Sequence, residues 1–413
     1  MKRILKKVGK YLLITFIGLF ITINAFILLS GRLYMYKGIA NTYLVGKAKP
    51  TIYDLDVFEY STIKATGKTK WKKHKDYNEP KISSSMRTYI EDLGTTAYLV
   101  MKGDSLIYEE YWDQHDDETV SNSFSMAKTV VAILVGIAVE EGKIGSLDES
   151  ASAYLPEFKG GDLEAVTIRH LLTMSSGLDW TESGKNPLSD NAESYYGWNL
   201  RELVTSQKLI DKPGKTFKYQ SGNTQLLAYI VEEATGRDLT KYAEEKILKK
   251  IGTTHDVFWS LDDKGGDEKA FCCMYATARD YARLGLMMLN KGKVGDEQVI
   301  PKWFYDEMIV PAKLKTEYGI PNYQYGLHVW TYFGNANPAY YFRGVDGQYI
   351  ITIPDEDLLI VRLGTERMPK FVIPDHLKKD KKYVEENKQE VGHALGFFQY
   401  ITLGKLLESQ TDL

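Results

Sequence analysis

The first thirty residues fix the topology of the chain before any other feature is weighed. Basic side chains crowd the first ten positions, and the stretch from Tyr11 to Ser30 carries no charge. About 20 apolar residues cross a bilayer as a helix. Because Lys and Arg favour the cytoplasmic side, we expect residues 1–10 in the cytoplasm and an uncleaved, single-pass anchor at 11–30. The rest of the chain then lies outside a bacterial cell membrane, which is the partner of the N-terminal helix.

Two alternatives stay open for the N-terminal region. A cleaved signal peptide is the rival interpretation, although the apolar run is longer than the usual hydrophobic segment of about 7–15 residues. No clear A-x-A cleavage site follows it. Residues 31–89 are polar, with lysines concentrated from Lys64 to Lys75, and we expect either a stalk or an extension that wraps the body.

Composition and charge exclude several classes of protein. The 52 Lys+Arg against 55 Asp+Glu give a net charge of -3, which creates no field for recruiting nucleic acid. The histidines are scattered without metal-ligand spacing, so we expect no metal site. The two cysteines, Cys272 and Cys273, are adjacent, and adjacent cysteines seldom form a disulfide. We therefore expect two small buried thiols. The oligomeric state is not indicated.

Apolar periodicity between residues 90 and 408 predicts an α+β domain. Thr96 to Tyr111 is typical of a β-hairpin around a Lys102-Gly103-Asp104 turn. Further strands are expected over 325–332, 348–353 and 358–363, a mainly helical block over about 130–310 and a last helix over about 390–408. The simplest assembly is one antiparallel sheet flanked by helices, with the helical block as a second lobe. Ligands favour such a lobe boundary.

The pattern Ser-x-x-Lys occurs twice, and its context separates the two copies. Ser61 and Lys64 lie in a polar stretch, whereas Ser125 begins an apolar helix that contains Lys128. A three-residue spacing puts both side chains on one face of the first helical turn. Desolvation lowers the pKa of a buried lysine, so Lys128 can accept the serine proton, and the helix N-terminus stabilises an oxyanion. The plainer interpretation is a helix-start serine followed by a surface lysine.

Two further segments, around Tyr219 and from Arg343 to Tyr349, supply candidates for proton transfer and for oxyanion binding. Tyr219 lies in a Tyr-Gln-Ser-Gly-Asn segment, and a phenol beside a lysine ammonium has a lowered pKa and can shuttle protons. The segment from Arg343 to Tyr349 opens an apolar strand with two glycines that let a ligand approach. We expect the backbone N–H groups of Ser125 and Gln348 to form an oxyanion hole. A loop tyrosine packed on the core and an ordinary hairpin turn are the alternatives.

Taken in order, these segments resemble the three motifs of the serine β-lactamase and penicillin-binding-protein superfamily: S-x-x-K, Y-x-N or S-x-N, and K-T-G or H-x-G. The likeness covers roughly residues 90 to 408 and is nearest to the class C β-lactamase-like group, which includes esterases, D-amino-acid peptidases and aminohexanoate-dimer hydrolases. The stretches that look like that group are RHLLTMSSGLDW (169–180), FKYQSGNTQLLAYIVEEATG (217–236), CCMYATARDYARLGLMML (272–289) and GQYIITIPDEDLLIVRLG (347–364).

The resemblance implies a β-lactamase/transpeptidase-like fold, acylation of Ser125 and acid and base roles shared by Lys128 and Tyr219. Two departures from the motifs limit it. Ser221 stands where many relatives carry Asn, and Val345-Asp346-Gly347 replaces the K-T-G tripeptide, so that an Asp would repel a substrate carboxylate. Supporting roles fall to Ser221, Asn223, Gly344, Asp346 and Gly347. Aromatic candidates for lining the cleft are Trp180, Tyr195, Tyr196 and Trp198, which core packing explains equally well.

The sequence therefore predicts a membrane-anchored serine hydrolase that cleaves amide or ester bonds of small or peptide-like substrates through an acyl-Ser125 intermediate. Such chemistry needs no metal or organic cofactor. Alternatives are a β-lactamase or a D,D-peptidase acting on cell-wall peptides, and a non-catalytic sensor of cell-wall fragments, since one fold hosts many functions.

Overall fold

The fold is built around a seven-stranded sheet that brings together segments from both halves of the chain. The computed structural model describes residues 2–67, 70–334 and 336–411. The strand order is β12-β13-β14-β15-β3-β4-β2, antiparallel except where β2 joins β4. The strands are β2 (Lys72–Lys73), β3 (Thr95–Lys102), β4 (Ser105–Tyr111), β12 (Trp330–Tyr332), β13 (Ala339–Arg343), β14 (Tyr349–Ile353) and β15 (Leu358–Gly364). The predicted sharing of one sheet by N- and C-terminal segments is confirmed, because β15 pairs with β3.

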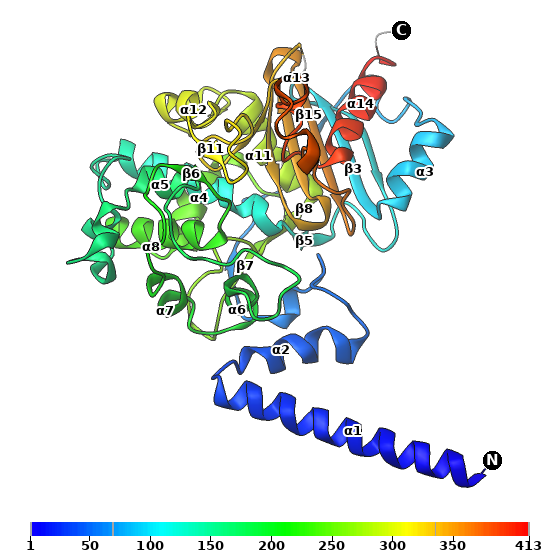
Figure 1. The fold of residues 1–413 in the computed structure, drawn as a ribbon. Helices are drawn as coiled ribbons and strands as arrows, with labels where there is room; N and C mark the ends of the chain where they lie inside the picture. The colour runs from blue at the N-terminus through cyan, green and yellow to red at the C-terminus, as the bar shows by residue number, and fades with distance from the viewer. Residues whose placement is uncertain (1, 68–69, 335, 412–413) are drawn as a thin grey trace.

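Both faces of the central strands of this sheet are buried. Leu99 and Met101 of β3 face a core shared with helices α4 and α11, while Tyr98 and Val100 face a second core closed by α14. These helices span Ala127–Glu140 (α4), Ala278–Leu289 (α11) and Leu395–Glu408 (α14). Figure 1 shows α14 and α11 on opposite sides of the sheet. Successive strand side chains point to opposite faces, so burial on both faces gives the continuous apolar runs seen in the sequence.

The helical lobe lies beside the α4 face of the sheet and contains a small second sheet. Its longest helix, α8, packs on α4 in the larger core. Helix α8 spans Ser221–Thr235, and the other helices are α5 (Ile168–Leu172), α6 (Asp190–Tyr196), α7 (Leu200–Thr205), α9 (Leu239–Ala243), α10 (Lys249–Ile251) and α12 (Lys302–Met308). The antiparallel second sheet has the order β1 (Tyr60–Ile63), β7 (Val257–Ser260), β8 (Met274–Thr277) and β5 (Val120–Asn122).

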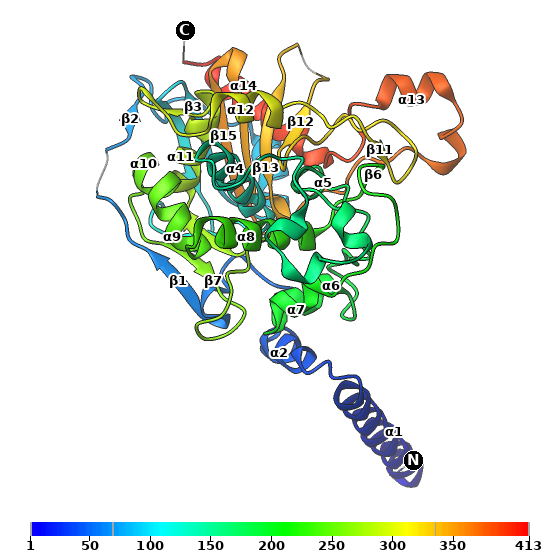
Figure 2. The same ribbon diagram turned by 90° about the vertical axis from the view of Figure 1, so that its left-hand side faces the viewer.

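The N-terminal region divides into a helix that stands apart and a segment that packs on the body. Helix α1 (Lys2–Leu29) extends away from the rest in Figures 1 and 2, and from Ile4 to Leu29 it is long and apolar enough to span a membrane, as a signal sequence also can be. After it, α2 (Tyr34–Asn41) contacts α6, and the Tyr34 hydroxyl donates to the Pro187 carbonyl at 2.9 Å. Residues 34–63 thus wrap the body, and α3 (Ser84–Asp92) leads into β3.

Two boundaries differ from the sequence prediction for backbone reasons. The strand expected from 325 is confined to Trp330–Tyr332, because His328 has a left-handed backbone with φ of 55°. The last helix begins at Leu395 instead of about 390, since Gly392 turns the chain with φ of 83°. Strand β13 was not predicted, because its five residues, Ala339–Arg343, contain no alternation of apolar and polar side chains.

Candidate active site

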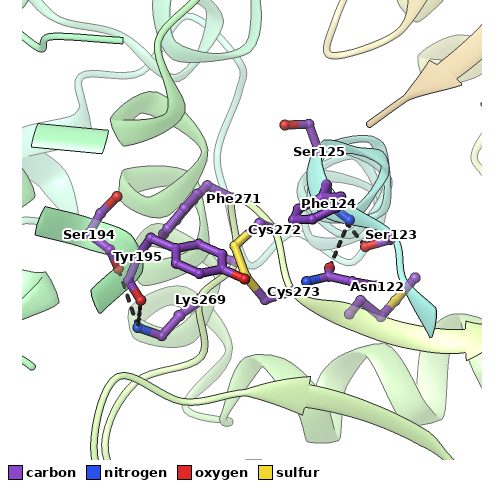
Figure 3. The surroundings of a disulfide bond; sticks show 12 residues. Asn122, Ser123, Phe124, Ser125, Ser194, Tyr195, Lys269, Phe271, Cys272 and Cys273 are labelled. Atoms are coloured by element: carbon purple, nitrogen blue, oxygen red, sulfur yellow. Dashed lines mark hydrogen bonds between the residues drawn. A yellow bond between two sulfur atoms is a disulfide. The ribbon is translucent and has the colours of Figure 1, made fainter. Parts of the chain in front are cut away.

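A tight turn presents Ser125 at the start of α4. Strand β5 ends at Asn122, whose side-chain oxygen accepts the Phe124 N–H at 2.8 Å, and Phe124 takes a left-handed backbone with φ of 43°. A non-glycine residue rarely adopts such a φ, and those that do cluster at functional sites. Phe124 and Met126 are buried, whereas Ser125 is partly exposed. Ser125 projects from the helix start on the side opposite to Asn122 (Figure 3).

Lys128 is buried directly beneath Ser125. Its side chain is 1% exposed, and its Nζ lies 3.2 Å from Ser125 Oγ and donates to the Phe271 carbonyl. Burial lowers the Lys128 pKa from 10.5 to about 8, although the negative charge of Glu182 opposes the shift. Desolvation disfavours the charged amine. A substantial fraction of Lys128 is therefore neutral near pH 8 and able to accept a proton.

Tyr219 completes the group, with its ring centroid 5.5 Å from Lys128 Nζ. The prediction that its pKa is lowered is wrong. Burial and the charge of Glu182 raise the Tyr219 pKa, and the side-chain hydrogen bond with Ser125 offsets this only in part. The phenol therefore stays protonated at neutral pH and acts as a hydrogen-bond donor.

The polar side chains of Ser221 and Asn223, which follow Tyr219, form hydrogen bonds with residues other than Ser125 and Lys128. The Ser221 hydroxyl donates to Glu182 at 2.8 Å, and the Ser221 N–H donates to the same carboxylate at 2.7 Å. The Asn223 side-chain oxygen accepts the Ser176 hydroxyl at 2.7 Å, inside the lobe. Trp180 is 1% exposed, and its indole N–H donates to Glu182 at 2.8 Å. Ser221 and Trp180 thus fix the carboxylate of Glu182, an exposed residue. Glu182 was not identified from the sequence, because it lies in no recognisable motif.

The third segment approaches the Ser125 turn through Gly344. A Cβ at Gly344 would lie 2.3 Å from the Ser123 carbonyl oxygen, so this position requires glycine. Val345 follows and is 46% exposed. Gln348 is fully buried, and its side chain donates to the Val345 carbonyl at 2.9 Å and the Gly364 carbonyl at 2.7 Å.

Asp346 is neutralised by a partner from the N-terminal segment. Its carboxylate accepts from Lys49 Nζ at 2.9 Å, and its side chain is 12% exposed. Gly347, with φ of 84°, packs so closely that a Cβ would lie 2.1 Å from Arg362 Nη1. The expected repulsion of a substrate carboxylate by Asp346 is therefore weakened by the Lys49 charge.

Three cations to which the sequence prediction gave no role in the site, Arg343, Arg367 and Lys370, gather beside Tyr219. Arg343 stacks on Trp330 at 3.2 Å, Lys370 lies 6.0 Å from the same ring, and the Trp330 and Tyr219 ring centroids are 5.6 Å apart. Arg367 is close enough for its charge to act on both Tyr219 and Lys370. Among residues 2–67, 70–334 and 336–411, no carboxylate lies within 4 Å of Arg343, Arg367 or Lys370. The like charge of Arg343, then partial desolvation of the amine and the charge of Arg367, lower the Lys370 pKa to about 7, although the residue as a whole is exposed.

The remaining aromatic candidates pack against the N-terminal segment. Tyr195 is 8% exposed and meets Phe58 edge to face at 5.2 Å. The Tyr196 ring lies against Gly38 of α2, and Trp198 borders a small cavity with Tyr34. The contacts of these three side chains are thus with the N-terminal segment, and none of the contacts described is with Ser125.

The expectation of two free thiols is wrong, because Cys272 and Cys273 are joined by a disulfide (Figure 3). Cys273 has a left-handed backbone with φ of 66°, and the Cys272 carbonyl accepts the Trp259 indole N–H at 2.9 Å. The pair directly follows Phe271, whose carbonyl accepts from Lys128.

The fold defines the class of protein: a helix-flanked antiparallel sheet joined to a helical lobe is the architecture of β-lactamases and transpeptidases. The β-lactamase family profile matches residues 86–377, so the chain belongs to the β-lactamase family, as the resemblance implied. That family includes hydrolases and penicillin-binding proteins.

Similarity to individual proteins is low in identity and differs in extent from one relative to another. The chain is 25% identical over 296 residues to the 6-aminohexanoate-dimer hydrolase of Paenarthrobacter ureafaciens, which covers 67% of this chain and 74% of that protein. It is 28% identical over 183 residues to Protein flp of Staphylococcus aureus, 40% of this chain and only 34% of that protein. A solved structure from Bacillus anthracis, provisionally named a 6-aminohexanoate-dimer hydrolase, superposes with a TM-score of 0.69 at 20% identity, covering 87% of this chain and 94% of its own.

Proposed function

We propose that this protein is a serine hydrolase that cleaves amide or ester bonds through an acyl-Ser125 intermediate. The observation that carries the proposal is the Lys128 amine, fully buried, with a pKa of about 8, 3.2 Å from the Ser125 hydroxyl. A lysine kept partly neutral beside a serine is an activated nucleophile pair. The alternative of a solvent-exposed lysine does not fit a side chain that is 1% exposed.

The reaction follows from these groups. Neutral Lys128 takes the Ser125 proton as Oγ attacks the carbonyl carbon, and the resulting oxyanion is stabilised by backbone N–H groups. Tyr219, which stays protonated, donates to the departing nitrogen or oxygen and is reprotonated by the Lys128 ammonium. Water then attacks the acyl-serine, again with Lys128 as base, and Lys128 returns the proton to Ser125 Oγ as the bond to the acyl carbon breaks and the acid is released.

For the oxyanion hole, the geometry favours Val345 over Gln348 as partner of the Ser125 N–H. Gly344, directly before Val345, is the residue whose backbone packs on Ser123, whereas Gln348 lies three residues further along, at the start of β14. The Gln348 side chain instead fixes the Val345 carbonyl at 2.9 Å and so supports the turn.

The substrate we propose is an amide that carries a carboxylate. Arg343, Arg367 and Lys370 gather beside Tyr219 without a carboxylate partner among the described residues, and such a cluster attracts an anionic group. The relative from Paenarthrobacter ureafaciens is named for an amide substrate. A β-lactamase or a D,D-peptidase remains the alternative function, because β-lactams and peptide C-termini also carry carboxylates. We place the body outside a cell membrane, anchored by α1.

The test of the proposed function is covalent labelling of the detergent-solubilised full chain by a fluorophosphonate probe. We expect one adduct per chain, which peptide mass spectrometry locates on Ser125. An adduct on any other serine would contradict the assignment. Absence of an adduct would favour the non-catalytic sensor.

Replacing Arg367 by methionine tests the preference for an anionic substrate. We expect KM for an amide that ends in a carboxylate to rise roughly tenfold, since a hydrogen bond to a charged group contributes about 1.5–3 kcal/mol. A neutral ester with the same acyl group should keep its KM. Lys378→Met, which removes a lysine paired with Asp375, is the matched control. Equal effects on both substrates would rule out a carboxylate site.

A further inference from the structure

The segment that follows α2 contacts both elements that meet at Ser125. It spans residues 47–54 and is fixed in itself, because Asp54 accepts from Lys47 Nζ at 2.8 Å and from the Thr51 N–H at 2.8 Å. Ile52 is fully buried. These contacts hold the segment against the body.

On one side the segment holds the residues that lead into Ser125. The Ile52 carbonyl accepts the Asn122 N–H at 2.8 Å. The Asn122 side-chain oxygen in turn accepts the Phe124 N–H at 2.8 Å, and Figure 3 shows this second hydrogen bond. The contact lies three residues before Ser125. Displacement of Ile52 would loosen the tight turn that presents the hydroxyl.

On the other side the segment holds the turn that follows Gly344. Lys49 Nζ donates to the Asp346 carboxylate at 2.9 Å, to the Thr365 carbonyl at 2.8 Å and to Glu366 at 3.2 Å. From inside the fold, Arg362 donates to the Asp346 and Gly347 carbonyls at 2.9 and 2.8 Å. The turn 345–347 is thus hydrogen-bonded on two sides by cations, Arg362 from the sheet and Lys49 from the N-terminal segment.

We propose that Lys49 is a positioning residue for the acylation step, which fixes the turn 345–347 relative to Ser125 so that both backbone N–H donors meet the developing oxyanion. This inference rests on the proposed function. It makes residues 47–54, between the membrane helix and the family-matched region 86–377, part of the active site. Oxyanion donors are effective only when they are held within a few tenths of an ångström of the productive geometry. Loss of the interaction between Lys49 and Asp346 should therefore lower the rate of acylation.

The effect should appear in the rate of acylation and not in binding. The oxyanion forms only in the transition state, and removing an interaction made there lowers kcat while leaving KM. Lys49 lies behind the turn, paired with Asp346, and makes no contact with Tyr219 or Lys128 among its described hydrogen bonds.

The experiment measures inactivation of the solubilised full chain by a fluorophosphonate probe, as a rate constant of acylation and an apparent binding constant. For Lys49→Met we expect the rate constant to fall about tenfold and the binding constant to stay within twofold. Lys49→Arg should restore most of the rate, because a guanidinium donates to the same acceptors. Lys64→Met, which removes a lysine paired with Asp256 at 2.7 Å in the same N-terminal region, should react like the wild type.

Asp346→Asn gives a second route to the same result, since asparagine accepts the left-handed φ of 59° at this position. It should slow acylation as Lys49→Met does, and the double variant should be no slower than either single one, because the two act through one interaction. This variant also decides the matter if Lys49→Met does not fold.

Full-rate acylation in Lys49→Met or in Asp346→Asn would overturn the positioning role, while labelling of Ser125 would still uphold the hydrolase. A fall in thermal stability with an unchanged rate constant would assign Lys49 a purely structural role. A wild-type chain that is not labelled would overturn the hydrolase, and the positioning role with it.

Discussion

We expect Ser125→Ala to abolish covalent labelling and to lower hydrolysis about 10³-fold or more. The change removes the hydroxyl that lies 3.2 Å from the Lys128 amine, and no second nucleophile replaces a serine that becomes acylated. Because Ser125 is partly exposed, the loss of its Oγ creates no buried cavity, and we expect thermal stability to change little. Probe labelling and thermal unfolding of both proteins check the two expectations.

The chain supplies its own control in the other Ser-x-x-Lys pair. Ser61 lies on strand β1, and Lys64 points to solvent and pairs with Asp256, so the pair has the spacing without the helix or the burial. Ser61→Ala should therefore label and hydrolyse as the wild type does. Full labelling of Ser125→Ala, or its loss in Ser61→Ala, would mean that the wrong copy had been chosen.

Local patterns were sufficient to predict the framework of the fold. The hairpin of β3 and β4 and the helix α4 combine an apolar run with a clear turn or stop, so each can be located from neighbouring residues alone. The same pattern left two positions open for Lys128, because a lysine on a helix that is apolar on nearly every side either reaches out to solvent or is desolvated beside a partner, and the structure shows it buried.

The surroundings of Ser125 depend on contacts between distant segments, which no local pattern reveals. Burial, and after it the charge of Glu182 from another loop of the lobe, raise the Tyr219 pKa, whereas the sequence predicted a lowered pKa. Gly344 and Gln348 both stand beside a plausible turn, and only the close approach of Gly344 to Ser123 separates them. The ion pair between Lys49 and Asp346 joins residues almost 300 positions apart.

Lys128→Met should lower acylation about 10³-fold while leaving the fold at least as stable at pH 7. Methionine has a similar shape and no amine, so the general base is lost without a large cavity. The fall of the Lys128 pKa from 10.5 to about 8 corresponds to about 3 kcal/mol of unfavourable charge burial at pH 7, which methionine does not incur. In the variant the Phe271 carbonyl loses its hydrogen bond from Lys128, which offsets part of this gain in stability.

The pH dependence gives this variant a second, independent readout. In the wild type, the neutral base becomes more abundant as pH rises, so acylation should increase about tenfold per pH unit below pH 8 and level off above it. The folded pKa lies below the unfolded value, hence the unfolded chain binds more protons between about pH 8 and 10.5, and the contribution of Lys128 to stability increases with pH across that window. Lys128→Met should lose both dependences, whereas Lys128→Arg, which remains protonated, should stay inactive at every pH. A wild-type acylation rate that is flat between pH 6 and 9 would show that Lys128 is not the base.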